Sequence, residues 1–362
     1  MHILFDARAL QAHLDGIGRY CIGVIRAMGS IRPDWKRTVI AGPDALDHLQ
    51  GMEIKLIPSS VPRFRFGENA KLSPVIEGSG ADIYMNFSMA GPRPDLPTFT
   101  AVHDVMVLTV PGYFGSSMLR NLLARYHFRK RIRSSVRHSD VIPVLSRASL
   151  EDLQKLFPEA GSKAFIAGAG QDLFKEVVGS EERSEFILYV GNARAYKNVT
   201  RLIVAYSRLK AINPKFPSMK MVVRRDRSYK EFMREIDDCS AGDSIDVISH
   251  VSDPELRKLY RNCRYLIMPS LKEGFGLPAL EAMSCGTPVI VSAGTSLEEI
   301  VGDAGVLVDP SSVIDIMRGM ALLASDGGLA GQLSRRALKR ALLFTWENTA
   351  EKIACRMEEV IS

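Results

Sequence analysis

Short apolar runs typical of β-strands alternate with helical patterns along nearly the whole chain of 362 residues. Parallel strands need a crossover between them, usually a helix, and such a sheet is covered by helices on both faces. The alternation therefore predicts an α/β fold with parallel sheets. The expected strands are 3–5, 38–41, 54–57, 83–87, 99–103, 141–144 and 164–167 in the first half, and 186–190, 219–223, 245–248, 265–268, 288–291 and 305–308 in the second.

The length of the chain and one polar segment predict two domains. A single hydrophobic core rarely grows beyond about 250–300 residues. The segment 175–185 is polar and offers no core positions, so we predict that it links the two domains. The expected domains are 1–175 and 186–346.

The composition excludes several classes of protein. Apolar residues make up 46% of the chain and charged residues 24%, as in a soluble globular protein. No apolar run approaches the ~20 residues of a transmembrane helix, and the N-terminus lacks the pattern of a signal peptide. The 5 cysteines are scattered, which favours a reducing compartment and argues against a structural zinc site. We therefore expect a cytoplasmic protein, and the net charge of +6 indicates an anionic partner.

A glycine pair, Gly16 and Gly18, stands between the first expected strand and the helix after it. Glycines at this place let backbone amides approach a ligand at the N-terminus of the helix. The pair matches only part of a dinucleotide-binding fingerprint, because Cys21 occupies the third glycine position and no acidic residue follows about 20 positions later. A dehydrogenase is therefore disfavoured. Glycines chosen only for a tight turn remain an alternative.

His103 and Asp104 stand at the end of the expected strand 99–103. Ligand contacts in open α/β sheets gather at the carboxyl ends of the strands. His103 is therefore a candidate site residue, although a lone histidine is also commonly structural. Both interpretations stay open at this point.

The stretch from Pro111 to Ser139 contains no acidic residue and predicts a basic amphipathic helix. Two interpretations stay open: residues 116–138 lie on an anionic membrane surface, or they form a solvated helix whose apolar stripe packs into the core. A nucleic-acid partner is not expected, because no binding module or stacking platform accompanies the charge. The basic residues are Arg120, Arg125, Arg129, Lys130, Arg131, Arg133 and Arg137, interleaved with Leu119, Leu122, Leu123, Tyr126, Phe128, Ile132 and Val136.

Arg194 and Lys197 follow the first strand of the second half, on the loop that leads into a helix. Cations beside the N-terminus of a helix make a phosphate site. Surface solubility is the alternative explanation for these two charges.

Two carboxylates, Glu273 and Glu281, follow the expected strand 265–268. Glu273 lies on a glycine-containing loop, and Glu281 lies in the first turns of a helix that begins at about Leu277. Carboxylates at the carboxyl end of a buried strand are well placed to bind a ligand. The alternative is an ordinary loop whose glutamates are solvated.

These segments together resemble the retaining glycosyltransferases of family 4, the group 1 glycosyltransferases, and in particular their mannosyltransferase-like branch. Members of that branch build lipopolysaccharide and other surface polysaccharides. The resemblance implies a GT-B fold, with two facing Rossmann-like domains, an active site in the cleft between them, and a final helix, about 347–362, packed back on the N-terminal domain. The residues that carry it are Glu273-Gly274-Phe275-Gly276-Leu277-Pro278, Glu281, Cys285-Gly286-Thr287-Pro288-Val289, Gly16, Gly18, His103-Asp104, Lys197-Asn198, Val251-Ser252-Asp253, Gly302-Asp303-Ala304 and Phe344-Thr345-Trp346-Glu347.

The resemblance also implies a role for each candidate. Glu281 would accept hydrogen bonds from the ribose of the donor, and Glu273 would contact the donor sugar. Lys197 would hold the diphosphate, and Arg194, Arg224 or Arg225 would complete the pair of cations. His103 would face the donor sugar, and Val251 would lie near the base. The backbone of Gly274, Phe275, Gly276 and Leu277 would line the sugar and the diphosphate. Gly16 and Gly18 would belong to a loop over the diphosphate.

The expected reaction is transfer of a hexose, with mannose favoured, from a nucleotide diphosphate sugar to a glycan or lipid-linked glycan. GDP-mannose is favoured over a UDP-sugar as donor. No D-x-D pair follows a strand, so no metal is expected, and cations would take its place. A same-face displacement is favoured over a double displacement. Two alternatives are a nucleotide-sugar 2-epimerase on the same fold and a non-catalytic nucleotide-sugar-binding protein.

Overall fold

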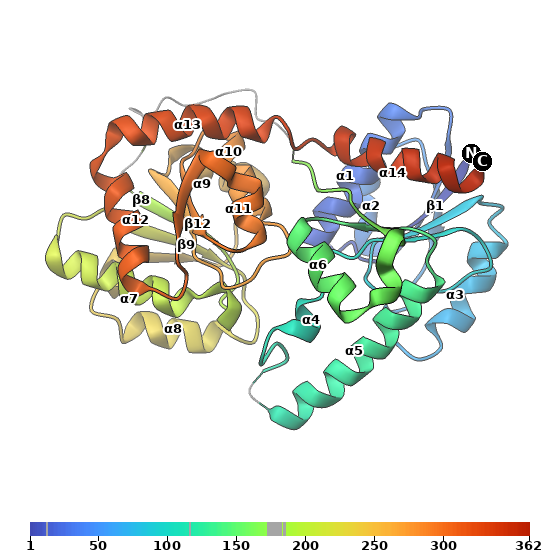
Figure 1. The fold of residues 1–362 in the computed structure, drawn as a ribbon, viewed down its shortest axis with the longest axis horizontal. Coiled ribbons are helices and arrows are strands. Elements are labelled where there is room, and N and C mark those ends of the chain that lie inside the picture. The colour runs from blue at the N-terminus through green and yellow to red at the C-terminus, as the bar shows by residue number, and fades with distance from the viewer. Residues whose placement is uncertain (12–13, 116, 172–182, 184–185) are drawn as a thin grey trace. The chain divides into compact units, whose positions relative to one another are not determined.

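The computed structural model describes residues 1–11, 14–115, 117–171, 183 and 186–362. The chain divides into two compact units (Figure 1): unit 1 is Met1–Gln171 with Phe344–Ser362, and unit 2 is Asp172–Leu343. The expected linker 175–185 lies, apart from Arg183, outside the described residues.

Unit 1 is built on a parallel 5-stranded sheet in the order β3-β2-β1-β4-β5. A parallel pair, β6 and β7, continues the sheet beyond β5 through single bridges at Val141 and Val144. The strand order reverses between β1 and β4, and an open α/β sheet binds its ligands at such a reversal, beyond the carboxyl ends of the strands. The strands are β1 His2–Asp6, β2 Lys36–Ala41, β3 Lys55–Pro58, β4 Ile83–Asn86, β5 Thr98–Thr100, β6 Ile142–Val144 and β7 Ala164–Ile166.

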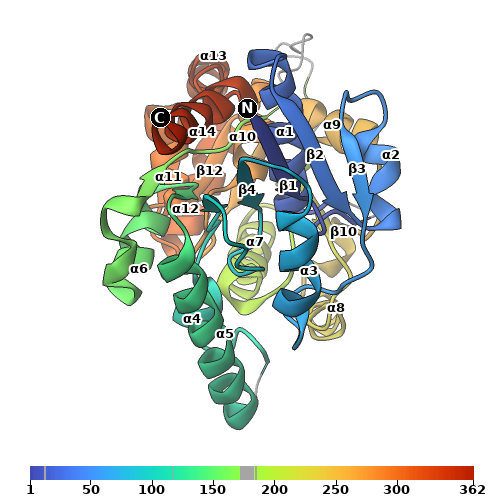
Figure 2. The ribbon, with the colours of Figure 1, turned by 90° about the vertical axis from the view of Figure 1, so that its right-hand side faces the viewer.

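The last helix of the chain packs on the first helix of unit 1 (Figure 2). Gly23 allows this close approach, because a Cβ there would overlap the indole of Trp346. Arg32 bridges Glu351 and Glu358, at 2.9 Å from each carboxylate. The helices of unit 1 are α1 Gly16–Ile31, α2 Leu46–Leu49, α3 Glu68–Glu77, α4 Met106–Thr109, α5 Met118–His138, α6 Arg147–Leu156 and α14 Trp346–Ile361.

Unit 2 is built on a parallel 6-stranded sheet in the order β10-β9-β8-β11-β12-β13. This is the strand order of a Rossmann fold, and it reverses between β8 and β11. Both of these central strands are buried, as expected for parallel strands covered on both faces. The strands are β8 Phe186–Gly191, β9 Ser218–Val223, β10 Ile245–Ile248, β11 Tyr265–Met268, β12 Val289–Ser292 and β13 Gly305–Val308.

Helices of unit 2 follow each strand and cover the sheet (Figure 1). They are α7 Val199–Ile212, α8 Tyr229–Asp237, α9 Asp253–Asn262, α10 Leu277–Ser284, α11 Ser296–Val301, α12 Val313–Ser325 and α13 Gly327–Ala341. Short 3₁₀ turns occupy Pro43–Ala45, Pro158–Lys163, Ala195–Lys197, Gly242–Ser244 and Gly302–Ala304.

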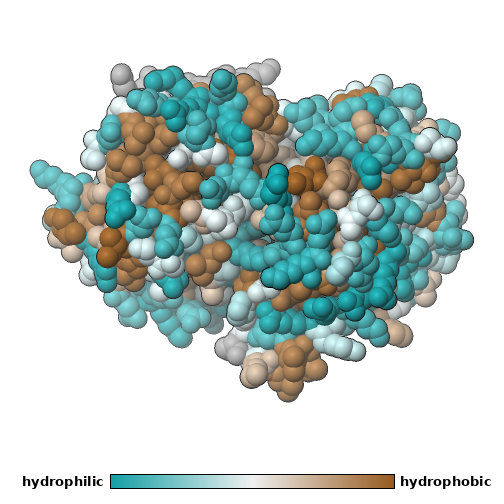
Figure 3. Space-filling view, viewed as in Figure 1, coloured by the Kyte–Doolittle hydropathy of each residue, from teal (hydrophilic) through white to brown (hydrophobic). Residues whose placement is uncertain are grey.

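The basic amphipathic helix forms as expected and is α5. In its second half, Ile132 and Val136 are fully buried in the core of unit 1, so this part of the apolar stripe is structural. In its first half, Leu119, Leu122 and Tyr126 are exposed, and apolar side chains gather at the free end of the helix (Figure 3). None of the described helices is both long enough and apolar enough to span a bilayer.

Candidate active site

Lys197 and Glu273 of unit 2 follow β8 and β11, where the order of the strands reverses. Lys197 Nζ donates a hydrogen bond of 2.6 Å to Glu273 Oε1, and both side chains are largely buried. Ser270 Oγ donates to the same oxygen at 2.7 Å. The fold thus joins a cation and a carboxylate that are 76 residues apart, at the place where α/β sheets bind ligands.

Asn198 fixes the Lys197 loop against the Glu273 loop. It has a left-handed φ of 63° at the start of α7, a conformation that asparagine tolerates better than most residues. Its Nδ2 donates to the carbonyls of Pro269 (2.8 Å) and Pro310 (2.7 Å). Leu271 N also donates to Tyr196 O at 2.8 Å. The position of Lys197 beside Glu273 is therefore set by backbone contacts as well as by the ion pair.

The Glu273 loop reaches α10 through Gly276, whose φ of 122° is accessible only to glycine at low cost. A Cβ at this position would also overlap Leu297. Ser296 Oγ donates to the carbonyls of Glu273 (3.0 Å) and Phe275 (3.1 Å) and so supports the loop from α11. Gly276 is the N-cap residue of α10 and has no side chain that could accept a hydrogen bond. The first backbone amides of α10 therefore receive no side-chain cap from this residue.

Glu281 lies on α10, and its Oε2 accepts a hydrogen bond of 2.7 Å from the hydroxyl of buried Tyr260 on α9. The carboxylate is thereby oriented by a rigid aromatic side chain. The two glutamates therefore lie on different kinds of structure: Glu273 is on a loop and Glu281 is on a helix. Val251 precedes Ser252, which caps α9 through a reciprocal capping box with Glu255.

The three candidate arginines differ in their surroundings. Arg194 Nε donates to Asp226 Oδ2 at 3.1 Å in a half-buried ion pair. Arg225 lies over the ring of Tyr229, at 5.4 Å from the ring centroid. Arg224 donates its backbone amide to Gly191 O and leaves its side chain exposed. Arg194 would have to exchange Asp226 for a phosphate in order to bind one.

In unit 1, Gly16 and Gly18 form the first turn of α1, which follows β1. Asp15 caps this helix, since its Oδ1 accepts a hydrogen bond of 2.9 Å from Gly18 N. The helix therefore begins at the strand reversal of unit 1, where the sequence places the glycine pair.

His103 follows β5 and is buried, with its Nε2 at 2.9 Å from Phe87 O. A carbonyl oxygen can only accept, so Nε2 carries the proton and Nδ1 is the acceptor. Tyr20 packs edge-on against the imidazole, with ring centroids 4.8 Å apart. Burial lowers the pKa of His103 to about 4, so the ring is neutral at pH 7. It can accept a hydrogen bond from a hydroxyl but carries no charge.

Arg63 is a candidate that the sequence did not single out. It comes from the loop after β3, and its Nη1 donates to Ser88 Oγ, just beyond β4, at 3.0 Å. Among the described residues it forms no ion pair, and its guanidinium lies over the ring of Phe64. Burial lowers the pKa of Arg63 from its ordinary value, while the charge of Asp15 opposes this effect. The result is a half-buried, positively charged side chain at the strand reversal of unit 1.

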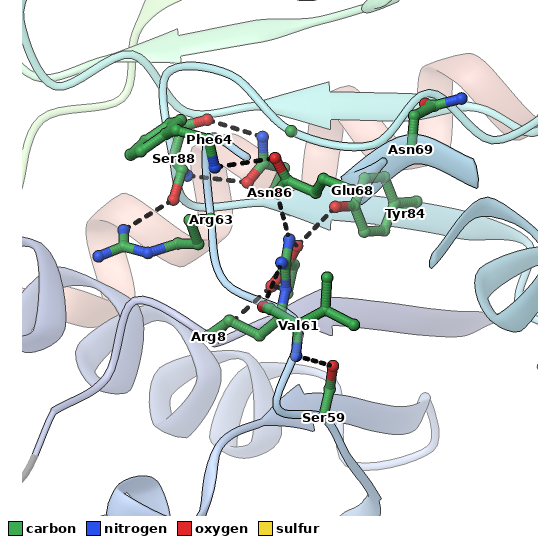
Figure 4. A network of polar contacts seen from close by, with 12 residues as sticks. Arg8, Ser59, Val61, Arg63, Phe64, Glu68, Asn69, Tyr84, Asn86 and Ser88 are labelled. Carbon is green, nitrogen blue, oxygen red and sulfur yellow. Dashed lines mark hydrogen bonds and ion pairs between the residues drawn. The ribbon is translucent and has the colours of Figure 1, made fainter. Parts of the chain in front are cut away.

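A buried ionic network holds the Arg63 loop (Figure 4). Arg8 bridges Asp6 (2.6 Å) and Glu68 (3.0 Å), and Arg131 contacts the second oxygen of Glu68 at 2.6 Å. That oxygen also accepts from Phe64 N at 2.9 Å, which supports the left-handed φ of 62° at Phe64. In Figure 4, Arg63 points away from this network toward Ser88. The two arginines and two carboxylates of this network, Arg8, Arg131, Asp6 and Glu68, balance one another in charge. Arg63 forms no ion pair with them.

Comparison with known proteins adds independent findings. Residues 170–340 match the family model described as glycosyl transferases group 1. The O-antigen chain mannosyltransferase B of Escherichia coli is 25% identical over 378 aligned positions, which cover 96% of this chain and 97% of that protein. The serotype-specific mannosyltransferase WbdA of Escherichia coli is 27% identical over 282 positions, covering 73% of this chain and 34% of that protein.

Solved structures share the fold at low sequence identity. A sucrose-phosphate synthase from Thermosynechococcus elongatus superposes with a TM-score of 0.77 at 17% identity, over 99% of this chain and 98% of that one. WaaG, a glycosyltransferase involved in lipopolysaccharide biosynthesis, superposes with a TM-score of 0.75 at 17% identity, over 97% of this chain and 98% of that one. These likenesses confirm the expected GT-B fold of two Rossmann-like units.

Proposed function

We propose that this chain, which matches the family model of the group 1 glycosyltransferases over residues 170–340, moves a hexose, with mannose favoured, from a nucleotide diphosphate sugar to a glycan or lipid-linked glycan. GDP-mannose is the favoured donor, and synthesis of a surface polysaccharide such as an O-antigen is the favoured setting. The observation that carries the proposal is the Lys197–Glu273 pair at the strand reversal of unit 2.

The proposed chemistry uses this pair in a defined order. The donor diphosphate draws Lys197 Nζ away from Glu273, and the carboxylate of Glu273 then contacts the sugar. As the bond from the anomeric carbon to the diphosphate breaks, negative charge grows on the leaving group and positive charge grows on the sugar ring. Lys197 and Glu273 each stabilise one of these charges more in the transition state than in the ground state.

The stereochemical course is proposed as a same-face displacement. The anomeric carbon loses its bond to the leaving phosphate oxygen, and that oxygen takes the proton of the acceptor hydroxyl. The acceptor oxygen forms the new bond from the same face, so the α-configuration is retained. The cationic side chains would stabilise the negative charge on the leaving diphosphate in place of a metal ion. Glu281 would accept hydrogen bonds from the ribose of the donor.

In unit 1 we assign a non-ionic role to His103. Its Nδ1 would accept a hydrogen bond from a hydroxyl of the donor sugar, because the ring is neutral and its Nε2–H is held by Phe87 O. Gly16 and Gly18 would approach the diphosphate through the backbone. The protein would work in the cytoplasm, in peripheral contact with the inner face of the cell membrane through residues 116–138.

The experiment that tests this function combines a thermal-shift screen with a transfer assay. GDP-, UDP-, dTDP- and ADP-sugars are screened first, since only a ligand that binds the folded state raises the apparent stability. Stabilisation by GDP-mannose followed by mannose transfer to an acceptor glycan is the expected result. Conversion of a nucleotide sugar without acceptor would favour the 2-epimerase instead. Stabilisation without any turnover would favour a binding protein.

His103 gives a pH-dependent prediction. A histidine with a pKa lowered by burial stabilises the folded state above its unfolded pKa of about 6.5, and this contribution is lost as the pH falls toward 4. The loss amounts to about 3 kcal/mol in order of magnitude. In His103→Gln the amide can still donate to Phe87 O but does not titrate. Its apparent Tm should therefore fall less than that of the wild type between pH 7 and pH 4.5.

The activity of the same variant separates structure from function. His103→Gln should lower kcat by about tenfold through a weaker acceptor for the sugar hydroxyl, with GDP affinity unchanged. The wild-type rate should show no titration near pH 6.5 from this residue. Unchanged kcat in the variant would make His103 a structural residue only.

Arg63 is expected to act on the acceptor. Arg63→Gln should raise the KM for an acceptor with an anionic group by about tenfold or more, since a charge-assisted hydrogen bond contributes about 1.5–3 kcal/mol. The affinity for GDP should change less than the KM for the acceptor, because the side chains assigned to the nucleotide, Lys197 and Glu281, belong to unit 2. Arg65→Gln, an exposed neighbour on the same loop, is the matched control. Equal KM values for both variants would remove Arg63 from the site.

A further inference from the structure

Arg183 of unit 2 comes shortly before β8, and its partly buried guanidinium binds uncharged oxygens. Among the residues that the structure describes it forms no ion pair, and burial lowers its pKa from the ordinary value. A buried charge is costly unless hydrogen bonds compensate it, so these oxygens hold the cation in place. The acceptors, at 2.7–3.3 Å, are the hydroxyl of Thr287 and the carbonyls of Arg261, Cys263, Cys285 and Gly286.

The four carbonyls lie at the C-terminal ends of two helices, since α9 ends at Asn262 and α10 ends at Ser284. The last carbonyls of a helix lack partners within it and carry partial negative charge, so a cation is stabilising there. The two amino groups of the Arg183 guanidinium divide between these ends: Nη1 binds at the end of α9 and Nη2 at the end of α10. Arg183 therefore fastens one helix end to the other. A lysine would supply the charge without the planar fork of donors.

The same two helices, which lie side by side (Figure 1), hold Glu281. The hydroxyl of Tyr260 on α9 donates to Glu281 Oε2 on α10 at 2.7 Å, so the orientation of this carboxylate depends on how the helices pack. Thr287 connects Arg183 to that pair, because its hydroxyl accepts from Arg183 Nη1 and donates to the carbonyl of Tyr260. Thr287 and Tyr260 are both buried. A path through two rigidly packed residues therefore joins the guanidinium to the carboxylate.

We propose that Arg183 is a positioning residue for the binding of the donor ribose, because it fastens α9 to α10 and so keeps Tyr260 and Glu281 in contact. The inference rests on the proposed role of Glu281 toward the ribose and adds Arg183 to it. Arg183 acts through the two helices and does not itself touch the donor. Without the guanidinium, the helix ends lose their shared partner and the helices shift against each other. Glu281 then no longer meets both ribose hydroxyls.

The test measures, by calorimetric titration of the full chain, the affinities for GDP and for dideoxy-GDP, whose ribose lacks both hydroxyls. The wild type should prefer GDP by at least about tenfold, since hydrogen bonds to a charged acceptor are strong. In Arg183→Gln this preference should fall by at least about threefold, because hydrogen bonds weaken steeply when their geometry is disturbed. A variant that is only less stable binds both nucleotides more weakly by the same factor, so the ratio of affinities reports the position of Glu281 and not stability.

Variants along the path test each link between Arg183 and Glu281. Tyr260→Phe removes the hydroxyl that contacts Glu281 and should lower the preference for GDP as Arg183→Gln does. Thr287→Val removes the link to Tyr260 with a side chain of similar shape, whereas Thr287→Ser keeps the hydroxyl. Of these two, only the valine variant should lower the preference, and it decides the question if Arg183→Gln does not fold. A wild-type preference in Thr287→Val and in any folded Arg183→Gln would overturn the proposal.

Arg264 provides the matched control in unit 2. It is also a partly buried arginine, and its Nη2 donates to the carbonyl of Ala324, near the end of α12, at 2.6 Å. Helix α12 carries none of the candidate site residues. Arg264→Gln should lower the Tm, as Arg183→Gln does, and keep the wild-type preference for GDP. An equal loss of preference in both variants would mean that weakening any helix end has this effect, which contradicts a specific role for Arg183.

Glu281→Ala separates this inference from the function on which it rests. The preference for GDP should disappear in this variant, because the acceptor of the ribose hydroxyls is gone. A preference that persists in Glu281→Ala would mean that the ribose is bound elsewhere, and the proposed role of Glu281 would fall together with that of Arg183. A preference that is lost in Glu281→Ala but intact in Arg183→Gln and Thr287→Val would overturn only the role of Arg183.

Discussion

Replacing Lys197 with alanine is expected to lower kcat for sugar transfer by about 100- to 1,000-fold while the chain remains folded. Lys197 Nζ lies 2.6 Å from Glu273 in a largely buried pair, so it is held at the strand reversal before any donor arrives. The departing diphosphate carries more negative charge in the transition state than in the donor. The loss should therefore affect kcat more than KM, and GDP should also bind more weakly.

A second lysine ion pair in unit 2 provides the matched control. Lys220 on β9 pairs with Asp246 at 3.2 Å, and both side chains are substantially exposed. Lys220→Ala removes the same kind of side chain and the same charge, and should leave kcat unchanged. Circular dichroism and gel filtration check that both variants are folded. Near-normal turnover in Lys197→Ala would contradict the assignment of the diphosphate site.

Replacing Glu273 with glutamine is expected to lower kcat by at least about 100-fold, with a different effect on nucleotide affinity. The amide oxygen can still accept the hydrogen bond from Ser270 Oγ, so the loop should keep its shape. The carboxylate charge that would stabilise the sugar ring is lost. Lys197 loses its partner at the same time and becomes free to bind a phosphate. GDP should therefore bind at least as tightly as it binds to the wild type.

The opposite responses of GDP affinity make the two substitutions a joint test. Lys197→Ala should weaken GDP binding, and Glu273→Gln should preserve or strengthen it, while both abolish most turnover. Asp246→Asn is the control for Glu273→Gln, since it neutralises the carboxylate of the exposed pair with Lys220. If both site variants weakened GDP binding equally, the pair would act as a structural unit and not as separate binding groups.

The alternation of apolar runs was sufficient to predict parallel α/β sheets, because the central strands β1, β4, β8 and β11 are almost fully buried and most of the helical patterns between the runs are crossovers. The expected strand 99–103 is the clearest difference, since β5 ends at Thr100. Beyond it Val102 forms only an isolated bridge with Val144. The apolar character of Ala101 and Val102 reflects burial, which periodicity alone does not separate from pairing in a sheet.

Lys197, Glu273 and Glu281 could be chosen as candidates from the sequence, because each follows an apolar run and lies at or near the start of a helical pattern. Arg63 was missed because nothing in its loop marks it. Its proximity to Ser88 depends on the reversal between β1 and β4 and on the Glu68 network. Tyr260, which orients Glu281, was missed for the same reason, since the pairing joins two helices. Contacts set by tertiary structure leave no periodic signal in the sequence.

The basic helix shows how the structure divides two interpretations that the sequence left open. The second half of its apolar stripe packs into the core through Ile132 and Val136. The first half is exposed through Leu119, Leu122 and Leu123. The spacing of apolar residues in the sequence predicts an apolar stripe along both halves of the helix. Only the packing of the neighbouring core shows which half of that stripe is buried.

The most direct measurement of the central claim is nuclear magnetic resonance of a reaction containing the protein, GDP-mannose and an acceptor glycan. We predict that the anomeric signal of GDP-mannose disappears while an α-mannosidic signal of the glycan appears. Both changes should be lost in Lys197→Ala and Glu273→Gln and kept in Lys220→Ala. Wild-type transfer that persists undiminished in Lys197→Ala and Glu273→Gln would contradict the claim that this pair is the site of sugar transfer.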